Sequence, residues 1–280
     1  MSSETIGILH PGLMGISVAA CALRSGHQVC YASEGRSDAT RARASEHSLR
    51  DLGTLAALCA ECSIIMSVCP PHAAKEVAAQ VGAHGFQGLY VDANAISPEK
   101  ARYIGEMLSK AGISFVDGGI IGGPAWTPGG TWLYLSGKDA ELIADCFSAG
   151  PLEVSIIGEE TGKASALKMC FAAYSKGTTA LLTAILALAE VSGVRKELST
   201  QWERDEVGFS QQAERRARRV IAKAWRFAGE MDEIASTFES AGLPGGFHVA
   251  AGDVYRRLAD FRGAEEFPEL ESVLAALLKS

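Results

Sequence analysis

The segment Thr5–Gly15 most constrains how this chain can fold. An apolar run, Ile6–Leu9, breaks at a His-Pro-Gly turn and is followed by a helix-like segment that carries Gly15. A strand, a tight glycine turn and a helix are typical of a dinucleotide-binding domain. Gly12 and Gly15 match the second and third glycines of the pattern G-x-G-x-x-G, while His10 replaces the first. We therefore predict a cofactor-binding turn in which histidine occupies one glycine position.

The start of the following helix offers a place for phosphate groups, because the first backbone amides of a helix point toward a bound anion. Gly12 would let the backbone approach a pyrophosphate, and Gly15 would let the helix pack closely on the strand. His10 either faces the phosphates or serves only as a turn residue, and the sequence leaves both interpretations open. The predicted cofactor-binding residues of this turn are His10, Pro11, Gly12, Leu13 and Met14.

Composition narrows the class of protein. Of the 280 residues, 48% are apolar and 21% are charged, which indicates a globular chain with a large core and enough length for two domains. The net charge of −7 repels polyanions and argues against nucleic acid as a partner. No apolar run reaches the roughly 20 residues of a membrane span, and the first strand lies too near the N-terminus to leave room for a signal peptide. We therefore expect a cytoplasmic protein with no membrane partner.

The seven cysteines give no sign of a disulfide framework or a metal site. Their number is odd and their spacing irregular, as expected in a reducing compartment. Cys59 and Cys62 form a C-x-x-C pair, but neither begins a helix and no second pair of ligands accompanies them. We expect buried, unreactive thiols and no bound metal.

Two domains are predicted from the pattern of elements. Strand-like and helix-like segments alternate from residue 5 to about residue 157, which indicates βαβ units. Only helical patterns follow, including a long apolar one over Gly162–Gly193 and another from about Glu203 to Ala228. The predicted fold is α/β: a Rossmann-type, doubly wound, mostly parallel sheet that binds NAD(P) (residues 1–160), then an all-α C-terminal domain for substrate binding and dimerisation (residues 161–280).

The end of the second predicted strand, Gln28–Ala32, should contact the adenosine ribose of the cofactor. Glu34 could bind the 2′-hydroxyl group of NAD, although it lies slightly late in the sequence. Arg36, together with Ser33, could bind the 2′-phosphate of NADP through charge-assisted hydrogen bonds. We favour NADP over NAD as the cofactor; the alternative is that Arg36 is a solvated loop charge.

Five sequence blocks, taken in order, resemble the β-hydroxyacid dehydrogenase superfamily, which includes the 3-hydroxyisobutyrate and 6-phosphogluconate dehydrogenases. The blocks, which cover about the first 180 residues, are Gly7–Gly15, Ser67–Pro71, Asp92–Pro98, Asp117–Gly123 and Gly162–Lys168. Gly7–Gly15 looks like the cofactor turn of that superfamily, and Ser67–Pro71 looks like its loop at the nicotinamide ribose. Asp92–Pro98 and Asp117–Gly123 look like its substrate blocks D-x-S-T-x-x-P and D-A-P-V-S-G-G. Gly162–Lys168 looks like the start of its long helix with the catalytic lysine. The His-Pro-Gly turn and the pair Phe247-His248 resemble a bacterial branch with a distinct helical C-terminal domain.

The resemblance implies roles for single residues. Lys168 would be the general acid and base of a hydride transfer, since a lysine can take or give a proton as hydroxyl and carbonyl interconvert. Asn94, which replaces a serine, could bond the reacting oxygen or the substrate, and it is also predicted to bind the cofactor. The other implied contacts are Cys69 and Pro70 to the cofactor, and the amides of Gly122 and Gly123 to an anionic group of the substrate.

Three further positions depart from the pattern of that superfamily. Ala172 replaces an asparagine, Ser175 replaces the acidic glutamate of 6-phosphogluconate dehydrogenases, and Ile121 replaces a serine. We therefore expect a substrate other than a simple 3-hydroxy acid held in the usual way. Ser175 lies at helical spacing from Lys168 and is predicted to bind this substrate.

Two residues of the C-terminal domain have alternative interpretations. His248 is predicted to bind the substrate; it could also be a second acid, or a packed histidine at a helix start. Lys176 could reach the pocket of Lys168 or pair with an acidic neighbour.

The sequence favours an NADP-dependent oxidoreductase that acts on a small hydroxy or oxo compound. The alternatives are an imine reductase and a non-catalytic NADP(H)-binding sensor protein. Because the long apolar helix has too little of its own chain to cover it, we also expect a homodimer formed through the C-terminal helices.

Overall fold

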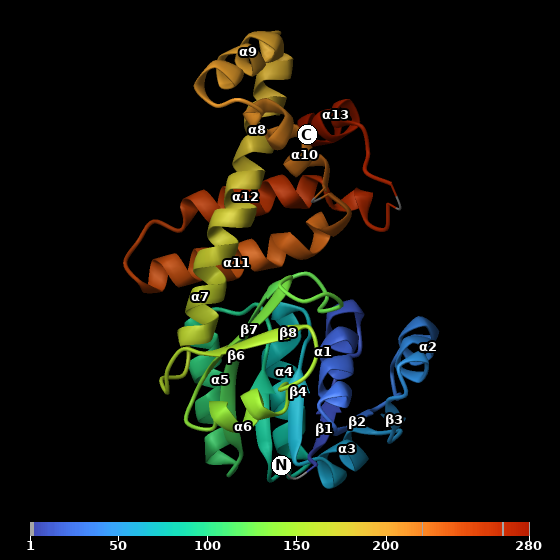
Figure 1. The fold of residues 1–280 in the computed structure, drawn as a ribbon. Coiled ribbons are helices and arrows are strands. Elements are labelled where there is room, and N and C mark those ends of the chain that lie inside the picture. The colour runs from blue at the N-terminus through green and yellow to red at the C-terminus, as the bar shows by residue number, and fades with distance from the viewer. Residues whose placement is uncertain (1–2, 220, 265, 280) are drawn as a thin grey trace. The chain divides into compact units, whose positions relative to one another are not determined.

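The computed structural model describes residues 3–219, 221–264 and 266–279 (Figure 1). The chain forms two compact units, Met1–Met169 and Cys170–Ser280, which are described one after the other. The boundary between them falls inside the helix α7 (Lys163–Ala172).

The first unit is built on one eight-stranded sheet with the strand order β3-β2-β1-β4-β5-β6-β7-β8. Its strands are β1 (Thr5–Ile8), β2 (Gln28–Tyr31), β3 (Arg50–Asp51), β4 (Ile64–Ser67), β5 (Leu89–Asp92), β6 (Ser114–Gly122), β7 (Thr131–Ser136) and β8 (Leu152–Ile156). All neighbouring strands are parallel except β6 and β7. The strand order reverses between β1 and β4, which makes the carboxyl ends of these two strands the topological switch point where α/β sheets bind ligands.

Helices cover both faces of this sheet, as Figure 1 shows. They are α1 (Leu13–Arg24), α2 (Asp38–Glu46), α3 (Leu55–Glu61), the short η1 (Pro71–Ala73), α4 (Ala74–Ala83), α5 (Pro98–Lys110) and α6 (Ala140–Asp145). Alternate residues of a strand face opposite sides, so Ile64 and Met66 of β4 join one apolar core and Ile65 joins the other. A sheet buried on both faces explains why its strands read as continuous apolar runs. The prediction of a doubly wound, mostly parallel sheet is confirmed.

The second unit is helical. After α7, a π-helical turn (Ala173–Gly177) leads into α8 (Thr178–Val191). The other helices are α9 (Arg195–Asp205), α10 (Phe209–Arg219), η3 (Ile221–Lys223), α11 (Ala224–Ser240), α12 (Gly246–Arg257), η4 (Ala259–Phe261) and α13 (Leu270–Leu278). The helical C-terminal region is confirmed.

The prediction of one helix from about Glu203 to Ala228 is wrong. Gly208 has a φ of +84°, which ends the helical path after α9. The Glu203 carboxylate then accepts hydrogen bonds from the backbone N–H groups of Gly208 (2.8 Å) and Ser210 (3.3 Å) and thereby caps α10. Apolar spacing alone did not reveal this cap.

Within the described residues, one helical segment, Lys163–Val191, is long and apolar enough to cross a membrane by length and composition alone. Half of its most apolar stretch is buried inside this structure. This continuous segment differs from the expectation that no such run exists, because α7, the π-helical turn and α8 join without a break.

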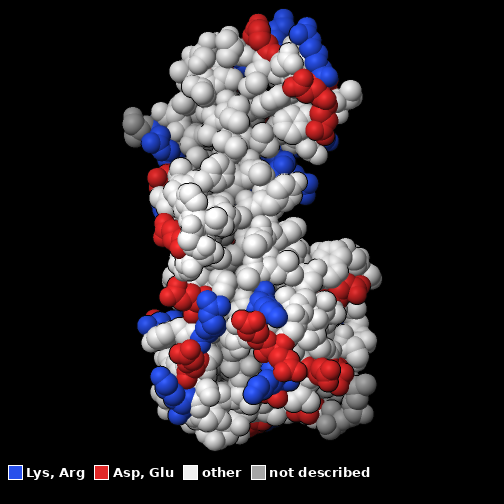
Figure 2. Space-filling view, turned by 90° about the vertical axis from the view of Figure 1, so that its left-hand side faces the viewer, with Lys and Arg blue, Asp and Glu red and all other residues white. Residues whose placement is uncertain are grey.

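Charges on the surface of the first unit are mixed. Figure 2 shows Lys and Arg side chains interspersed with Asp and Glu on one face of this unit. In the part of the chain that the structure describes, no group of three or more His, Cys, Asp or Glu side chains could hold a metal ion.

Candidate functional site

The glycine turn lies where β1 reaches the switch point of the sheet. The N–H of Gly12 donates to the carbonyl oxygen of His10 (2.8 Å), and α1 begins at the next residue. A Cβ atom on Gly15 would lie 2.2 Å from the His10 carbonyl oxygen, so this helix can pack on the turn only with glycine there. A Cβ atom on Gly12 would meet nothing within 4 Å. The start of α1, where Leu13 is exposed and Met14 is half-buried, therefore leaves open space for a phosphate group.

His10 and Arg36 approach each other beside this turn. Burial and the charge of Arg36 lower the pKa of His10 to about 4, so its imidazole is neutral at pH 7. The Arg36 charge also acts on the thiol of Cys69, whose pKa burial raises to about 11. His10 Nδ1 and Arg36 Nε are both buried, and neither has a hydrogen-bond partner among the described residues. The charge of Arg36 thus acts on two other predicted cofactor-binding residues, and His10 and Arg36 carry nitrogen atoms that an anionic ligand could bond.

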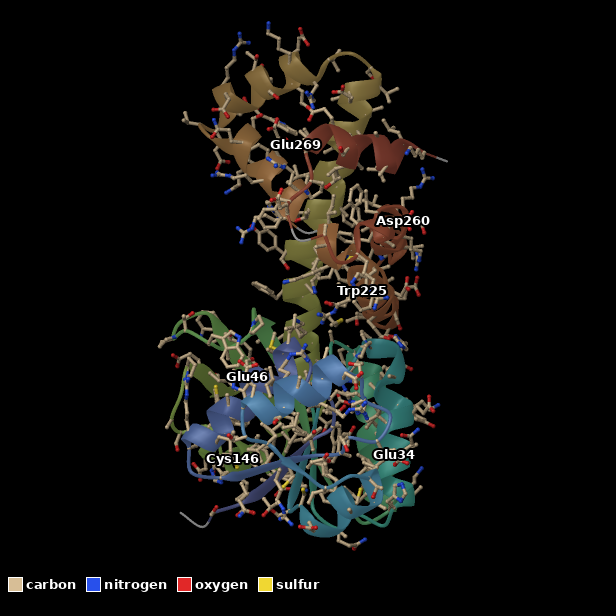
Figure 3. The ribbon with its side chains drawn as sticks, turned by 90° about the vertical axis from the view of Figure 1, so that its right-hand side faces the viewer. Glu34, Glu46, Cys146, Trp225, Asp260 and Glu269 are labelled. Atoms are coloured by element: carbon tan, nitrogen blue, oxygen red, sulfur yellow. The ribbon has the colours of Figure 1, made fainter. Side chains whose placement is uncertain are left out.

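The loop after β2 is fixed by an aspartate, Asp51, that no sequence pattern indicated. The Asp51 carboxylate of β3 accepts hydrogen bonds from the N–H groups of Ser33 (3.2 Å) and Gly53 (2.8 Å). Ser33 is half-buried, whereas Glu34 is exposed on the surface of the first unit (Figure 3). The two-residue strand β3 gave no apolar signal, since both of its residues are exposed.

A second missed residue, Arg43, ties α2 to the glycine turn. Its Nη1 donates to the carbonyl oxygen of Pro11 (3.1 Å). The Arg41 side chain, two positions earlier, instead pairs with Asp38 at the surface (2.6 Å). Arg43 lies in the last turn of α2, and only the fold brings that turn to Pro11.

Asn94 connects the ends of β5 and β4. Its Oδ1 accepts from the N–H of Cys69 (2.5 Å), and its Nδ2 donates to Ser67 Oγ (3.0 Å). Its own N–H donates to Asp92 Oδ1 (3.0 Å), and the whole residue is 2% exposed. Pro70 is the next residue after Cys69, and its carbonyl oxygen accepts a hydrogen bond from the N–H of Ala73 (3.0 Å) where η1 begins. That Asn94 contacts the reacting oxygen stays a prediction, since most of its amide is already engaged within the protein.

Four buried polar residues form a row across the sheet. The register pairs Ser67 with Asp92, Asp92 with Asp117, and Asp117 with Ser136. Burial raises the pKa of Asp92 to about 7, and the charge of Asp117 adds to this rise. Hydrogen bonds from Asn94 and the charge of Lys100 oppose it. Asp92 Oδ2 has no hydrogen-bond partner among the described residues. Burial therefore keeps the Asp92 carboxyl group protonated to a higher pH than that of an ordinary aspartate.

Asp117 caps the helix that carries Lys168. Its carboxylate accepts from the N–H groups of Gly162 and Ser165 (both 3.0 Å), from Ser165 Oγ (2.6 Å) and from Ser136 Oγ (3.0 Å). Burial raises the pKa of Asp117, and these bonds oppose that rise. Four donors and a helix N-terminus stabilise the ionised form, which explains how this carboxylate can be buried.

Lys168 lies one turn after this cap, at the end of β6. A Cβ atom on Gly119 would lie 2.7 Å from the Ala164 carbonyl oxygen, so α7 rests directly on the strand. Lys168 Nζ donates to the carbonyl oxygen of Ile120 (2.6 Å). Gly122 and Gly123 follow within three residues of that carbonyl group, and a Cβ atom on Gly123 would meet nothing within 4 Å. The first unit thus fixes the predicted lysine to Ile120 of β6, two residues before Gly122 and three before Gly123.

The second unit holds Ser175 and His248. Ser175 Oγ donates to the carbonyl oxygen of Phe171 within its own helix (2.9 Å). His248 is 5% exposed, and its ring packs against Phe238 and Phe247 at centroid distances of 4.4 and 5.3 Å. Burial lowers the pKa of His248, and its Nδ1 has no hydrogen-bond partner among the described residues. Substrate binding by Ser175 and His248 stays a prediction.

Lys176 lies in the π-helical turn, a feature often found at functional sites. Its ammonium group pairs with Glu230 of α11 and lies 4.5 Å from the centre of the Phe227 ring. Tyr255 Oη donates to the Lys176 carbonyl oxygen (2.7 Å). Of the two interpretations of Lys176, the structure supports pairing with an acidic neighbour.

Comparison with known proteins identifies the class to which this site belongs. Residues 5–149, more than half of the chain, match the family described as the NAD binding domain of 6-phosphogluconate dehydrogenase. The chain belongs to this family, which confirms the predicted kinship with β-hydroxyacid dehydrogenases, a class of NAD(P)-dependent dehydrogenases and reductases. Residues 189–258 match a family described only as a domain of unknown function, DUF1932.

Individual proteins are similar to this chain in sequence or in fold. An uncharacterized 28.5 kDa protein of Methanothermus fervidus is 29% identical over 171 residues, which are 61% of this chain and 64% of that protein. A conserved hypothetical protein from Sinorhizobium meliloti shares the fold with a TM-score of 0.72 and 23% identity, over 99% of this chain and 96% of that one. The 3-hydroxyisobutyrate dehydrogenase of Mycobacterium tuberculosis, solved with L-serine, gives a TM-score of 0.72 at 16% identity, over 99% and 100% of the two chains.

The fold also extends to enzymes solved with nicotinamide cofactors. An imine reductase from Myxococcus stipitatus in complex with NAD⁺ gives a TM-score of 0.58 at 18% identity, over 99% of this chain and 100% of that one. A reductive aminase from Aspergillus terreus in complex with NADPH gives 0.59 at 16% identity, over 98% and 99%. These structures share the fold of this chain, and the family match to an NAD binding domain supports a nicotinamide cofactor in the first unit.

Proposed function

We propose that this chain is an NADP-dependent oxidoreductase that transfers a hydride between the nicotinamide and a small hydroxy or oxo compound, with Lys168 as general acid and base. The observation that carries this proposal is the position of Lys168 Nζ, 2.6 Å from the Ile120 carbonyl oxygen at the carboxyl end of β6. That end belongs to the same sheet edge as the glycine turn, where cofactors bind in such folds.

The residues of the first unit can divide the chemistry among them. The bound nicotinamide supplies or accepts the hydride. Lys168 as a neutral amine takes the hydroxyl proton of an alcohol, and as an ammonium ion it returns a proton to the developing alkoxide. The amides of Gly122 and Gly123 bind an anionic group of the substrate, while the amides of Leu13 and Met14 hold the pyrophosphate.

The substrate class is open to direct test. A panel of carbonyl compounds and imines, assayed with NADPH and NADH, separates the candidate activities. Turnover of hydroxy or oxo compounds supports the proposal, and turnover of imines alone would make the chain an imine reductase. Tight NADPH binding without turnover of any panel member would favour a sensor protein.

Preference for NADP is proposed to rest on Arg36, with Ser33 beside it. Arg36→Ala should weaken NADPH binding by roughly 10- to 100-fold, because a hydrogen bond to a charged group contributes about 1.5–3 kcal/mol. NADH, which lacks the 2′-phosphate, should bind the variant and the wild type with similar affinity. Fluorescence titration with both nucleotides measures the two affinities.

The matched control is Arg41→Ala, because the Arg41 side chain lies in the same region but pairs with Asp38 at the surface. This variant should bind NADPH as the wild type does. Equal loss of NADPH and NADH affinity in Arg36→Ala would contradict a role in selecting the 2′-phosphate.

We also propose a homodimer formed through the long helix. Tyr174, Leu181 and Leu188 recur at intervals of seven residues, and their exposed fractions are 67%, 44% and 66%. In α8 this spacing places Leu181 and Leu188 along one face, as in helices that pack on a second helix, and Tyr174 precedes them in the π-helical turn. Light scattering should give the mass of two 29.5 kDa chains. Leu188→Glu should give the mass of one chain, whereas a wild type with the mass of a single chain would contradict the dimer.

A further inference from the structure

The segment Ser67–Pro71 leaves β4 at the switch point, and the side chain of Asn94 fastens it to β5. One amide group makes both connections: Asn94 Oδ1 accepts from the Cys69 N–H, and Nδ2 donates to Ser67 Oγ. Ser67 Oγ also lies 3.7 Å from Cys69 Sγ, so Ser67, Cys69 and Asn94 each contact the other two.

Asn94 itself is firmly placed. Its backbone N–H donates to Asp92 Oδ1, and both residues are buried at the end of β5. Hydrogen bonds from Asn94 also counter the rise in the Asp92 pKa that burial causes. An anchor that is buried and bonded at three points can hold a loop in one position.

The topology indicates what this loop meets. The pyrophosphate of a dinucleotide binds at the start of α1, and the adenosine half lies over β2, where Ser33 and Arg36 are found. The other half must therefore extend to the opposite side of β1, and the neighbouring strand there is β4. The segment Ser67–Pro71 lies at the carboxyl end of that strand.

We propose that Asn94 is a positioning residue, which holds the Ser67–Pro71 segment in place to receive the nicotinamide half of the cofactor. This inference rests on the proposed function, since it assumes that the crevice binds a nicotinamide dinucleotide. In this role Asn94 does not touch the substrate. It acts through its hydrogen bonds to Cys69 and Ser67. An amide suits the task because it offers an acceptor to one group and a donor to the other, which neither a carboxylate nor a hydroxyl does in the same geometry.

The test compares two nucleotides that share the adenosine half. NADPH contains the nicotinamide, whereas adenosine 2′,5′-bisphosphate lacks it. Asn94→Ala should raise the Kd for NADPH by about 10-fold, the effect of losing roughly one hydrogen bond's contribution to binding. The Kd for adenosine 2′,5′-bisphosphate should stay within about twofold of the wild-type value. Titration calorimetry measures both constants.

Two further variants make the comparison sharp. Ser67→Ala removes one of the two side-chain hydrogen bonds of Asn94 and leaves its bonds to Cys69 and Asp92, so it should show the same split with a smaller change. Arg36→Ala is the matched opposite, because it should weaken both nucleotides by removing a contact to their shared 2′-phosphate.

Three outcomes would count against the inference in distinguishable ways. If the wild type binds neither nucleotide, the proposed function fails before any variant is compared. If Asn94→Ala and Ser67→Ala weaken both nucleotides equally, the positioning role fails alone. If Asn94→Ala binds NADPH normally and kcat falls more than 100-fold, Asn94 touches the reacting atoms and the proposed indirect role is wrong.

Discussion

Replacing Lys168 by alanine should lower kcat by about 10²- to 10⁴-fold while NADPH binds with nearly unchanged affinity. The range is what a positioned general acid or base contributes to a proton transfer. Cofactor binding should be spared because the groups expected to hold the phosphates, the α1 amides and Arg36, come from other elements. Steady-state kinetics on a substrate found in the carbonyl panel, together with NADPH titration, measures the two effects.

Two further variants test whether the loss of kcat in Lys168→Ala comes from losing a general acid and base. Lys168→Arg keeps a positive charge that can reach the Ile120 carbonyl oxygen but cannot act as a neutral base, so its kcat should stay close to that of Lys168→Ala. Lys163→Ala, in the same helix, removes a lysine that pairs with Glu160 at the surface and should keep wild-type kcat. Full activity in Lys168→Arg would show that charge alone suffices and would contradict general base catalysis.

Asp92→Asn should stabilise the folded chain at pH 8 and change its stability little at pH 4. In the unfolded chain an aspartate titrates near about 3.9, whereas burial raises the folded pKa of Asp92 to about 7. Between these values the folded chain keeps a proton that the unfolded chain has lost. The stability that Asp92 contributes is therefore fully present below pH 4, falls as pH rises, and levels off above pH 7.

The size of this effect follows from the width of that interval. At about 1.4 kcal/mol per pH unit, an interval of about three units corresponds to at most about 4 kcal/mol in the free energy of unfolding. Asparagine cannot ionise, yet it keeps an oxygen for the Asn94 N–H, so the variant should escape this loss. Urea unfolding of both proteins at pH 4.5, 6 and 8 measures the difference.

Asp260→Asn serves as the control, because Asp260 is an exposed aspartate of the second unit (Figure 3). Its unfolding curve should follow that of the wild type at every pH. A difference between Asp92→Asn and the wild type that does not grow from pH 4.5 to pH 8 would mean that Asp92 is ionised in the folded chain.

The sequence was sufficient for much of the fold. Apolar runs bounded by glycine and proline predicted the main strands, since both faces of the sheet are buried and such strands need continuous apolar residues. The two-residue strand β3 escaped notice because its residues are polar and exposed. The break between α9 and α10 escaped notice because it depends on Gly208 and on a carboxylate cap, which apolar periodicity does not register.

The candidate site was only partly readable from sequence. The glycine turn and Lys168 stand in local motifs with a clear physical purpose, so single residues could be named. Arg43, Asp51 and the buried row from Ser67 to Ser136 act through partners 18 to 48 positions away along the chain, as in the bonds of Asp51 to Ser33 and of Asp117 to Ser165. These hydrogen bonds form only when the strands pair in the correct register, and no local sequence pattern predicts them.

The hydrogen bond between Lys168 and Ile120 also has an entropic consequence. A free lysine side chain samples many rotamers, and immobilising it costs about 1.5–2 kcal/mol. Because the Ile120 carbonyl group already restrains Lys168, much of this ordering takes place when the chain folds. A ligand that arrives at Lys168 would meet a preorganised group, so less of its binding energy would be spent on arranging the protein.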